Sequence, residues 1–323
     1  MPMADVSLIE QLDQAVNAIV ADSDATIPSV SERVQALLRV AIELRDLPRA
    51  DFRSGLKADL TGRAPMTTTA AKSIREGFHT ITPYLIVQHA AELIDFVKLA
   101  FGGEELLRGT GSAGGIHCEV RIADSIVMIG GGGAWRGTPK PTGIHLYVED
   151  VDAVYQRALQ AGAMSLQGPV VQPYGDREAS VKDLSGNHWY IATHQGVEHI
   201  PEGLRAVTPF LHPRGADRMI EFLTKAFGAE EVSRAQAPDG VIHHATVRIG
   251  DSMLEMGEAH GQWQPMATTF FLYVDDVDGL YRRAVAAGAI PQSEPADQPY
   301  GDRVAGVSDP FDNVWYIATH ITA

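Results

Sequence analysis

The feature that most constrains this chain is an internal duplication of a unit of about 115 residues. The hexapeptide WYIATH occurs at Trp189–His194 and again, 126 residues later, at Trp315–His320. Other pairs keep the same order and nearly the same offset: ITPYL with VTPFL, RIADS with RIGDS, LYVEDVD with LYVDDVD, and QPYGDR with a second QPYGDR. Both copies are therefore expected to fold alike.

Each copy divides into two modules with the same pattern of elements. TPYLIV is rich in residues that favour strands, and AAELIDFVKLAFG is an amphipathic helix ended by Gly102. Three short strands follow, and the same order starts again at Gly143. Each copy is predicted to be βαβββ followed by βαβββ, which places the chain in the α+β class.

The order of TPYLxV, RIxDS, YVxDVD and GDR…WYIATH in both copies resembles the glyoxalase/bleomycin resistance/dioxygenase superfamily, also called vicinal oxygen chelate, and most of all its PhnB-like branch. The resemblance implies that two βαβββ modules form a cup-shaped sheet with helices on its convex side. It also implies a small-molecule site on the concave side. We expect one such domain at 79–196 and a second at 205–323, packed as an intramolecular pseudo-dimer, with a homo-oligomer left open.

The residues before the duplication have a different character. Capping boxes at Ser7 and Ser29 open apolar helical stripes, so 1–60 is predicted to be a helical appendage or docking arm. The composition of 61–78 is that of a linker.

Composition excludes several classes of partner. A net charge of −15 argues against a nucleic-acid partner, because phosphate binding needs a basic face. No apolar run is long enough to span a bilayer. The single cysteine, Cys118, permits no internal disulfide and no cysteine-based metal cluster, and we expect it to be buried. With no secretory signal at the start of the sequence, a cytoplasmic location is predicted.

The resemblance also implies four strand positions at which family members hold a divalent metal. In the first copy these positions are occupied by Thr82, Met128, Gly143 and Tyr190. None is a usual ligand, so no metal is expected there. In the second copy they are Thr208, Glu255, Thr269 and Tyr316, and strand alternation adds His212 and His244 to the same face. Two histidines and one glutamate suit a divalent ion, so His212, His244 and Glu255 are candidate ligands. The alternative is that they are polar cup residues contacting a ligand or water.

Strand alternation yields a wider set of candidate ligand-binding residues. They are Tyr84, His117, Arg121, His145, Tyr147, Tyr190, Phe210, His244, Arg248, Phe271, Tyr273 and Tyr316. His117 and His244 occupy equivalent positions and, with Glu255, are the candidates for catalysis. Trp135 and Trp263 lie in the crossovers that follow the fourth strands of their modules and either close over a pocket or pack on a neighbour.

Three classes of function remain open from the sequence. The first is a protein that binds a small organic molecule in one or both cups, without a metal in the first domain. The second is a metal-dependent lyase, isomerase or dioxygenase that uses the second domain. The third is a scaffold or regulator that acts through the helical segment 1–60. Whether the protein is an enzyme stays open, and no cofactor other than a divalent metal is predicted.

Overall fold

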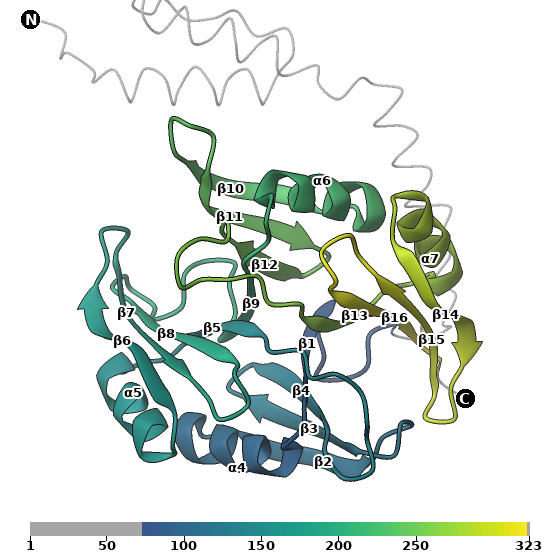
Figure 1. Cartoon of the computed structure of the whole chain (residues 1–323), viewed down its shortest axis with the longest axis horizontal. Coiled ribbons are helices and arrows are strands. Elements are labelled where there is room, and N and C mark those ends of the chain that lie inside the picture. The colour runs from purple at the N-terminus through teal and green to yellow at the C-terminus, as the bar shows by residue number, and fades with distance from the viewer. Residues whose placement is uncertain (1–72, 322–323) are drawn as a thin grey trace, which may run out of the picture. The chain divides into compact units, whose positions relative to one another are not determined.

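A computed structural model describes residues 73–321, so the predicted helices at 1–60 lie outside the described residues. In chain order the elements are β1 (Ile81–Val87), α4 (Ala90–Phe101), β2 (Glu104–Thr110), β3 (Ile116–Ile122), β4 (Ser125–Gly131), β5 (Gly143–Tyr147), α5 (Val151–Gln160), β6 (Met164–Val171), β7 (Asp176–Lys182), β8 (His188–His194), β9 (Val207–Leu211), α6 (Ala216–Phe227), β10 (Glu230–Gln236), β11 (Ile242–Ile249), β12 (Ser252–Met256), β13 (Thr269–Tyr273), α7 (Val277–Ala286), β14 (Ile290–Asp297), β15 (Asp302–Ser308) and β16 (Val314–His320) (Figure 1). The predicted βαβββ order is confirmed in all four modules. Within 73–321, no helix combines the length and apolarity that a bilayer crossing requires.

Helix ends follow from local sequence. Asp150 and Asp276 of the DVD motifs are N-caps, and each carboxylate accepts a backbone N–H three residues later. Gly102 and Gly228 end α4 and α6 in the left-handed conformation, at φ 69° and 71°, which glycine adopts without steric cost.

The two eight-stranded sheets combine modules from different copies. One has the order β14-β15-β16-β13-β1-β4-β3-β2 and the other β10-β11-β12-β9-β5-β8-β7-β6. The junctions are antiparallel, with Ile81 of β1 opposite Leu272 of β13 and Leu146 of β5 opposite Val207 of β9. Each sheet contains two modules as expected, but residues 79–196 and 205–323 do not each supply a whole cup.

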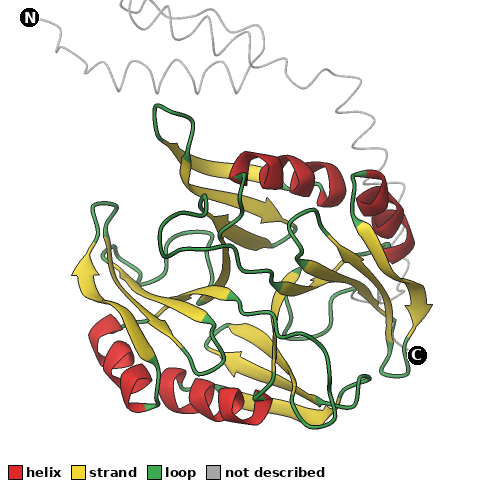
Figure 2. Ribbon diagram, viewed as in Figure 1, coloured by secondary structure: helices red, strands yellow, loops and turns green. Residues whose placement is uncertain are grey.

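Each helix-side core, by contrast, is built largely from the residues of one copy. Helices α4 and α5 cover a core built around Trp189, and α6 and α7 cover one built around Trp315. Figure 2 shows these helix pairs on opposite sides of the two sheets. Cys118 is buried in the first core, as predicted. Each copy closes its own helix-side core, but its strand edges pair with strands of the other copy. The expectation that each copy forms one whole cup was therefore wrong.

The repeated RIxDS motif stabilises the junction between copies. The Thr80 N–H donates to Asp251 Oδ1 at 2.8 Å, and the Ile81 N–H donates to Ser252 Oγ at 3.0 Å. The reciprocal bonds, at 3.1 and 3.2 Å, run from Ala206 and Val207 to Asp124 and Ser125. The motif therefore satisfies the first backbone amides of a strand in the other copy.

The tryptophan of the repeated WYIATH hexapeptide also has a structural role. Trp189 is fully buried, and its Nε1 donates to Asp183 Oδ2 at 2.9 Å; Trp315 and Asp309 repeat this bond at the same distance. A buried indole N–H needs such an acceptor, which accounts for the aspartate six residues before each tryptophan.

Candidate functional site in the two cups

The face of the second sheet opposite the helices is the β5–β9 cup. In β5, Ile144 and Leu146 face the helix-side core, so strand alternation turns His145 to the other face. The polar and aromatic side chains that line this cup are His145, Tyr190, Phe210, His212, His244 and Glu255.

Glu255 forms the polar centre of the β5–β9 cup. Its side chain is 3 % exposed, and its two carboxylate oxygens accept hydrogen bonds from His145 Nδ1 at 2.8 Å and His244 Nε2 at 3.2 Å. Burial by itself raises the pKa of Glu255, but the charges and hydrogen bonds of the two histidines outweigh it and lower the pKa to about 2. The carboxylate is therefore ionised at neutral pH.

His145 is the second buried member of this pair. Burial lowers the pKa of His145, but the charge and hydrogen bond of Glu255 outweigh that effect and raise it. Its other ring nitrogen, Nε2, is buried and has no hydrogen-bond partner among the described residues. In the protonated imidazole this atom is an N–H donor that is free for an acceptor. His212 Nδ1 is a second buried ring nitrogen of the cup without a hydrogen-bond partner among the described residues.

An aromatic cluster forms the other half of the cup. The Tyr190 hydroxyl lies 2.7 Å from His212 Nε2, and the Trp263 ring stacks on His212 with centroids 5.8 Å apart. Burial, together with the charges of His188 and His260, lowers the pKa of His212 to about 4. His212 is therefore neutral at pH 7, and Tyr190 donates to it. Trp263 packs on Tyr190 and His212. Packing on a neighbour was one of the two arrangements considered from the sequence.

The equivalent face of the first sheet is the β1–β13 cup, and the chain itself fills it. Phe78 packs there with Met128, Phe271 and Tyr273 in a buried cluster. The rings of Phe78 and Tyr273 meet edge to face at 5.7 Å. The segment that leads into β1, predicted only as linker, thus supplies core side chains to this cup.

A buried ion pair holds the same segment in place. The Arg75 guanidinium pairs with Glu119, which is 2 % exposed, and lies 4.4 Å above the Phe78 ring. The Tyr84 hydroxyl and His117 Nδ1 lie 3.0 Å apart beside this pair. Burial raises the pKa of Glu119, but hydrogen bonds from His117 and Arg75 outweigh it and lower the pKa. These four polar side chains of the β1–β13 cup therefore satisfy one another.

The remaining predicted residues occupy other positions. Arg121 and Arg248 are exposed, and each pairs with a glutamate of the neighbouring strand, so the structure does not bring them to the cup centres. Tyr147 is buried, and its hydroxyl donates to Asp176 at 3.2 Å. Tyr273 and Asp302 repeat that bond at 3.0 Å. Tyr316 borders the buried cluster around Phe78.

The predicted metal ligands are only partly assembled. His244 reaches Glu255, but His212 Nε2 is engaged with Tyr190, and the second partner of the carboxylate is His145 from the other copy. Within 73–321, no three His, Cys, Asp or Glu side chains are placed to hold a metal ion. The arrangement does not fit a resident metal, and no chemical step is assigned to one.

Comparison with known proteins identifies the family. The family model of the glyoxalase/bleomycin resistance protein/dioxygenase superfamily matches residues 211–317, a range that runs from the end of β9 into β16. The chain belongs to this superfamily. Its PhnB-like branch remains a prediction.

Two curated relatives are similar in sequence to part of the chain, and two solved structures are similar in fold. The uncharacterized proteins Mb0911c of Mycobacterium bovis and Rv0887c of Mycobacterium tuberculosis are each 41% identical over 120 residues, covering 34% of this chain and 79% and 71% of theirs. Glyoxalase I from Zea mays is similar at a TM-score of 0.56 and 15% identity, over 74% of this chain and 92% of that one. A putative dioxygenase from Bacillus subtilis is similar at 0.52 and 16%, over 79% and 87%. At these identities the structures show the fold alone.

Proposed function

We propose that this superfamily member binds a small organic molecule in the β5–β9 cup. The observation that carries the proposal is the buried His145 Nε2, which has no hydrogen-bond partner within 73–321 although His145 Nδ1 and His244 Nε2 both reach Glu255. A buried donor left unpaired costs about 1–3 kcal/mol, so a partner that completes it gains binding free energy. The β1–β13 cup is not proposed as a site, because Phe78 and Arg75 occupy it.

The side chains of the cup favour a particular ligand chemistry. His145 Nε2 suits a carbonyl, hydroxyl or carboxylate oxygen. The centroid of the Tyr190 ring lies 5.2 Å from that of Phe210 and 5.4 Å from that of Trp263. Together these rings suit a planar apolar body. We infer an oxygen-bearing aromatic or conjugated compound.

The other cup supplies a variant that tests this proposal. Phe271 and Met128 stand where the β5–β9 cup has His145 and Glu255, so the double substitution H145F/E255M copies the filled cup. Saturation-transfer NMR with benzoate, acetophenone and catechol would measure binding to both proteins. Binding that is lost in the double variant supports the proposal. Equal binding by both proteins, or none by the native protein, contradicts it.

A second candidate is acid–base catalysis in the same cup, favoured by the position of His244. Its side chain is 40 % exposed, yet its Nε2 donates to the buried Glu255 carboxylate. A histidine oriented by a carboxylate at a cup mouth can accept a proton from a bound substrate. Turnover of a substrate at the native rate by the His244→Gln variant would exclude this role.

Elemental analysis of the native protein and of Glu255→Ala tests the metal-dependent alternative. That alternative requires about one divalent ion per chain in the native protein and its loss in the variant.

A further inference from the structure

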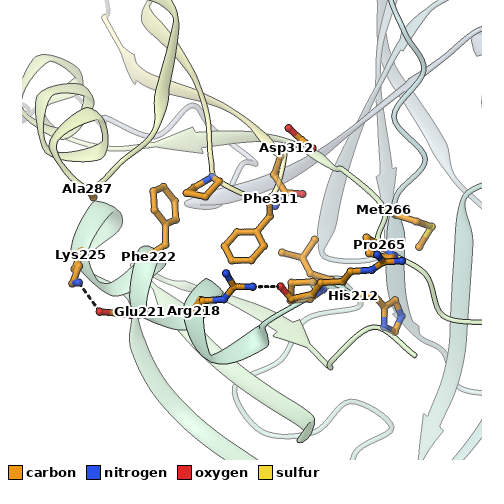
Figure 3. Close-up of a pocket in the computed structure, with 15 residues that line it drawn as sticks. His212, Arg218, Glu221, Phe222, Lys225, Pro265, Met266, Ala287, Phe311 and Asp312 are labelled. Carbon is orange, nitrogen blue, oxygen red and sulfur yellow. Dashed lines mark hydrogen bonds and ion pairs between the residues drawn. The ribbon is translucent and has the colours of Figure 1, made fainter. Parts of the chain in front are cut away.

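A cavity of about 440 Å³ lies beside α6 of the second copy. One wall is α6, and the opposite wall is the turn between β15 and β16 (Figure 3). Phe222 contributes an aromatic ring from α6, and Phe311 contributes one from the turn. Its volume falls within the range of small-molecule sites.

The cavity is lined by three cations, Arg214, Arg218 and Lys225, and by two carboxylates, Glu221 and Asp312, in a chain whose net charge is −15. Lys225 pairs with Glu221 at 2.6 Å, but Arg214 and Arg218 form no ion pair with any residue of 73–321. Two guanidinium groups beside an apolar wall provide the donors that a carboxylate or phosphate needs.

Local structure holds both guanidinium groups in place. Arg218 Nη2 donates to the Arg214 carbonyl oxygen at 2.8 Å, and Arg214 Nη2 donates to Gln264 Oε1 at 3.1 Å. Gly215, at φ 99°, permits this placement, because a Cβ there would lie 2.6 Å from Arg218 Nε. Each arginine uses one of its five N–H donors in these bonds, which leaves several for a ligand.

The start of α6 does not itself supply the anion site. Its free amides at Gly215 and Ala216 already donate to the Glu258 carboxylate, both at 2.8 Å. Recognition of an anion here therefore depends on the two arginine side chains.

The first copy lacks these cations. The residues equivalent to Arg214, Arg218 and Lys225, 126 positions earlier, are Gln88, Glu92 and Leu99. The cationic cavity is thus specific to the second copy and is not required by the shared fold.

We propose that this cavity binds a small organic acid, with its carboxylate on Arg214 and Arg218 and its apolar body between Phe222 and Phe311. The proposal does not rest on the β5–β9 cup, because Arg214, Arg218, Phe222 and Phe311 are not among the cup residues. His212 lines the cavity and also hydrogen-bonds Tyr190, so it is the one residue common to both sites.

A charged and a neutral probe of the same shape test the proposal on the full chain. The probes are 2-naphthoate and 2-naphthamide, and binding is followed by NMR of ¹³C-methyl methionine. Met266 lines the cavity, and its resonance is assigned with Met266→Leu. We expect 2-naphthoate to shift the Met266 methyl signal and to bind at least about tenfold more tightly than 2-naphthamide, since a charged hydrogen bond contributes about that factor.

Substitutions then assign the charge recognition to this cavity. Arg218→Gln should weaken 2-naphthoate binding by about tenfold or more. Arg282→Gln, which removes the same charge from the exposed side of α7, should leave binding unchanged. Equal binding of both probes, equal loss in both variants, an unmoved Met266 signal, or absence of binding would each overturn the proposal.

Discussion

His145 Nδ1 and Glu255 Oε2 lie 2.8 Å apart although 110 positions separate the residues in the sequence. One belongs to the first copy of the duplication and the other to the second. Their contact exists because β5 pairs with β9, and β9 pairs with β12. At the equivalent positions of the other cup, Phe271 and Met128 pack in an apolar cluster with Phe78. At these two positions the same fold thus holds a buried ion pair in one cup and apolar side chains in the other.

This contrast predicts a non-additive effect of substitution. E255M alone leaves the His145 imidazole buried without its counter-charge and should cost about 3–5 kcal/mol in the free energy of unfolding. H145F/E255M restores the apolar pairing found in the β1–β13 cup and should recover most of that loss. Urea unfolding of the native protein, both single variants and the double variant measures the coupling. Additive costs would contradict a direct interaction between the two side chains.

The same pair predicts a pH window for stability. Because the pKa of Glu255 is lowered from 4.5 to about 2, its contribution is present above 4.5 and is lost as the pH falls toward 2. Because the pKa of His145 is raised above 6.5, its contribution is present below 6.5 and is lost as the pH rises through the folded-state value. The stability difference between the native protein and H145F/E255M should therefore be largest between pH 4.5 and 6.5. A difference that does not vary with pH would show that the pair is not ionised.

The segment before β1 is predicted to stabilise the β1–β13 cup. Phe78 is 6 % exposed, so Phe78→Ala should cost about 3–5 kcal/mol in unfolding free energy. Leu204 occupies the equivalent position before β9 and is only half-buried, so Leu204→Ala should cost less than about 2 kcal/mol. Thermal and urea unfolding of both variants make the comparison. Equal losses of unfolding free energy in Phe78→Ala and Leu204→Ala would contradict the prediction that the segment before β1 stabilises its cup more than the segment before β9 does.

The crossed sheets predict the behaviour of an isolated copy. A fragment of residues 73–200 would retain its helix-side core, but the edges of β1 and β5 would lose β13 and β9. We expect such a fragment to dimerise by pairing β1 of one chain with β5 of another, because exposed strand edges associate. Light scattering coupled to size-exclusion chromatography measures the mass. A folded monomer would contradict this expectation.

Much of the fold was predictable from short-range patterns. The alternation in β5 and the glycine that ends α4 appear as expected, and the capping aspartates Asp150 and Asp276 likewise depend on residues near in sequence. The site was less predictable. His145, His244 and Glu255 were each identified as candidates, but His212 was expected to join His244 and Glu255 as a metal ligand, whereas the structure places His145 against Glu255 and His212 against Tyr190. Arg75 and Phe78 were not identified, because a linker composition does not reveal that a side chain inserts into a distant sheet.

The sequence by itself determined the duplication, the four βαβββ modules and the superfamily, because repeated motifs and hydrophobic periodicity reflect local structure. Only the tertiary structure decided which modules share a sheet. Backbone hydrogen bonds at a strand edge do not depend on side-chain identity, so β1 carries no pattern that distinguishes β13 from β5 as its partner. That choice brings His145 to Glu255 and Phe78 to Phe271, and so makes the two cups chemically different.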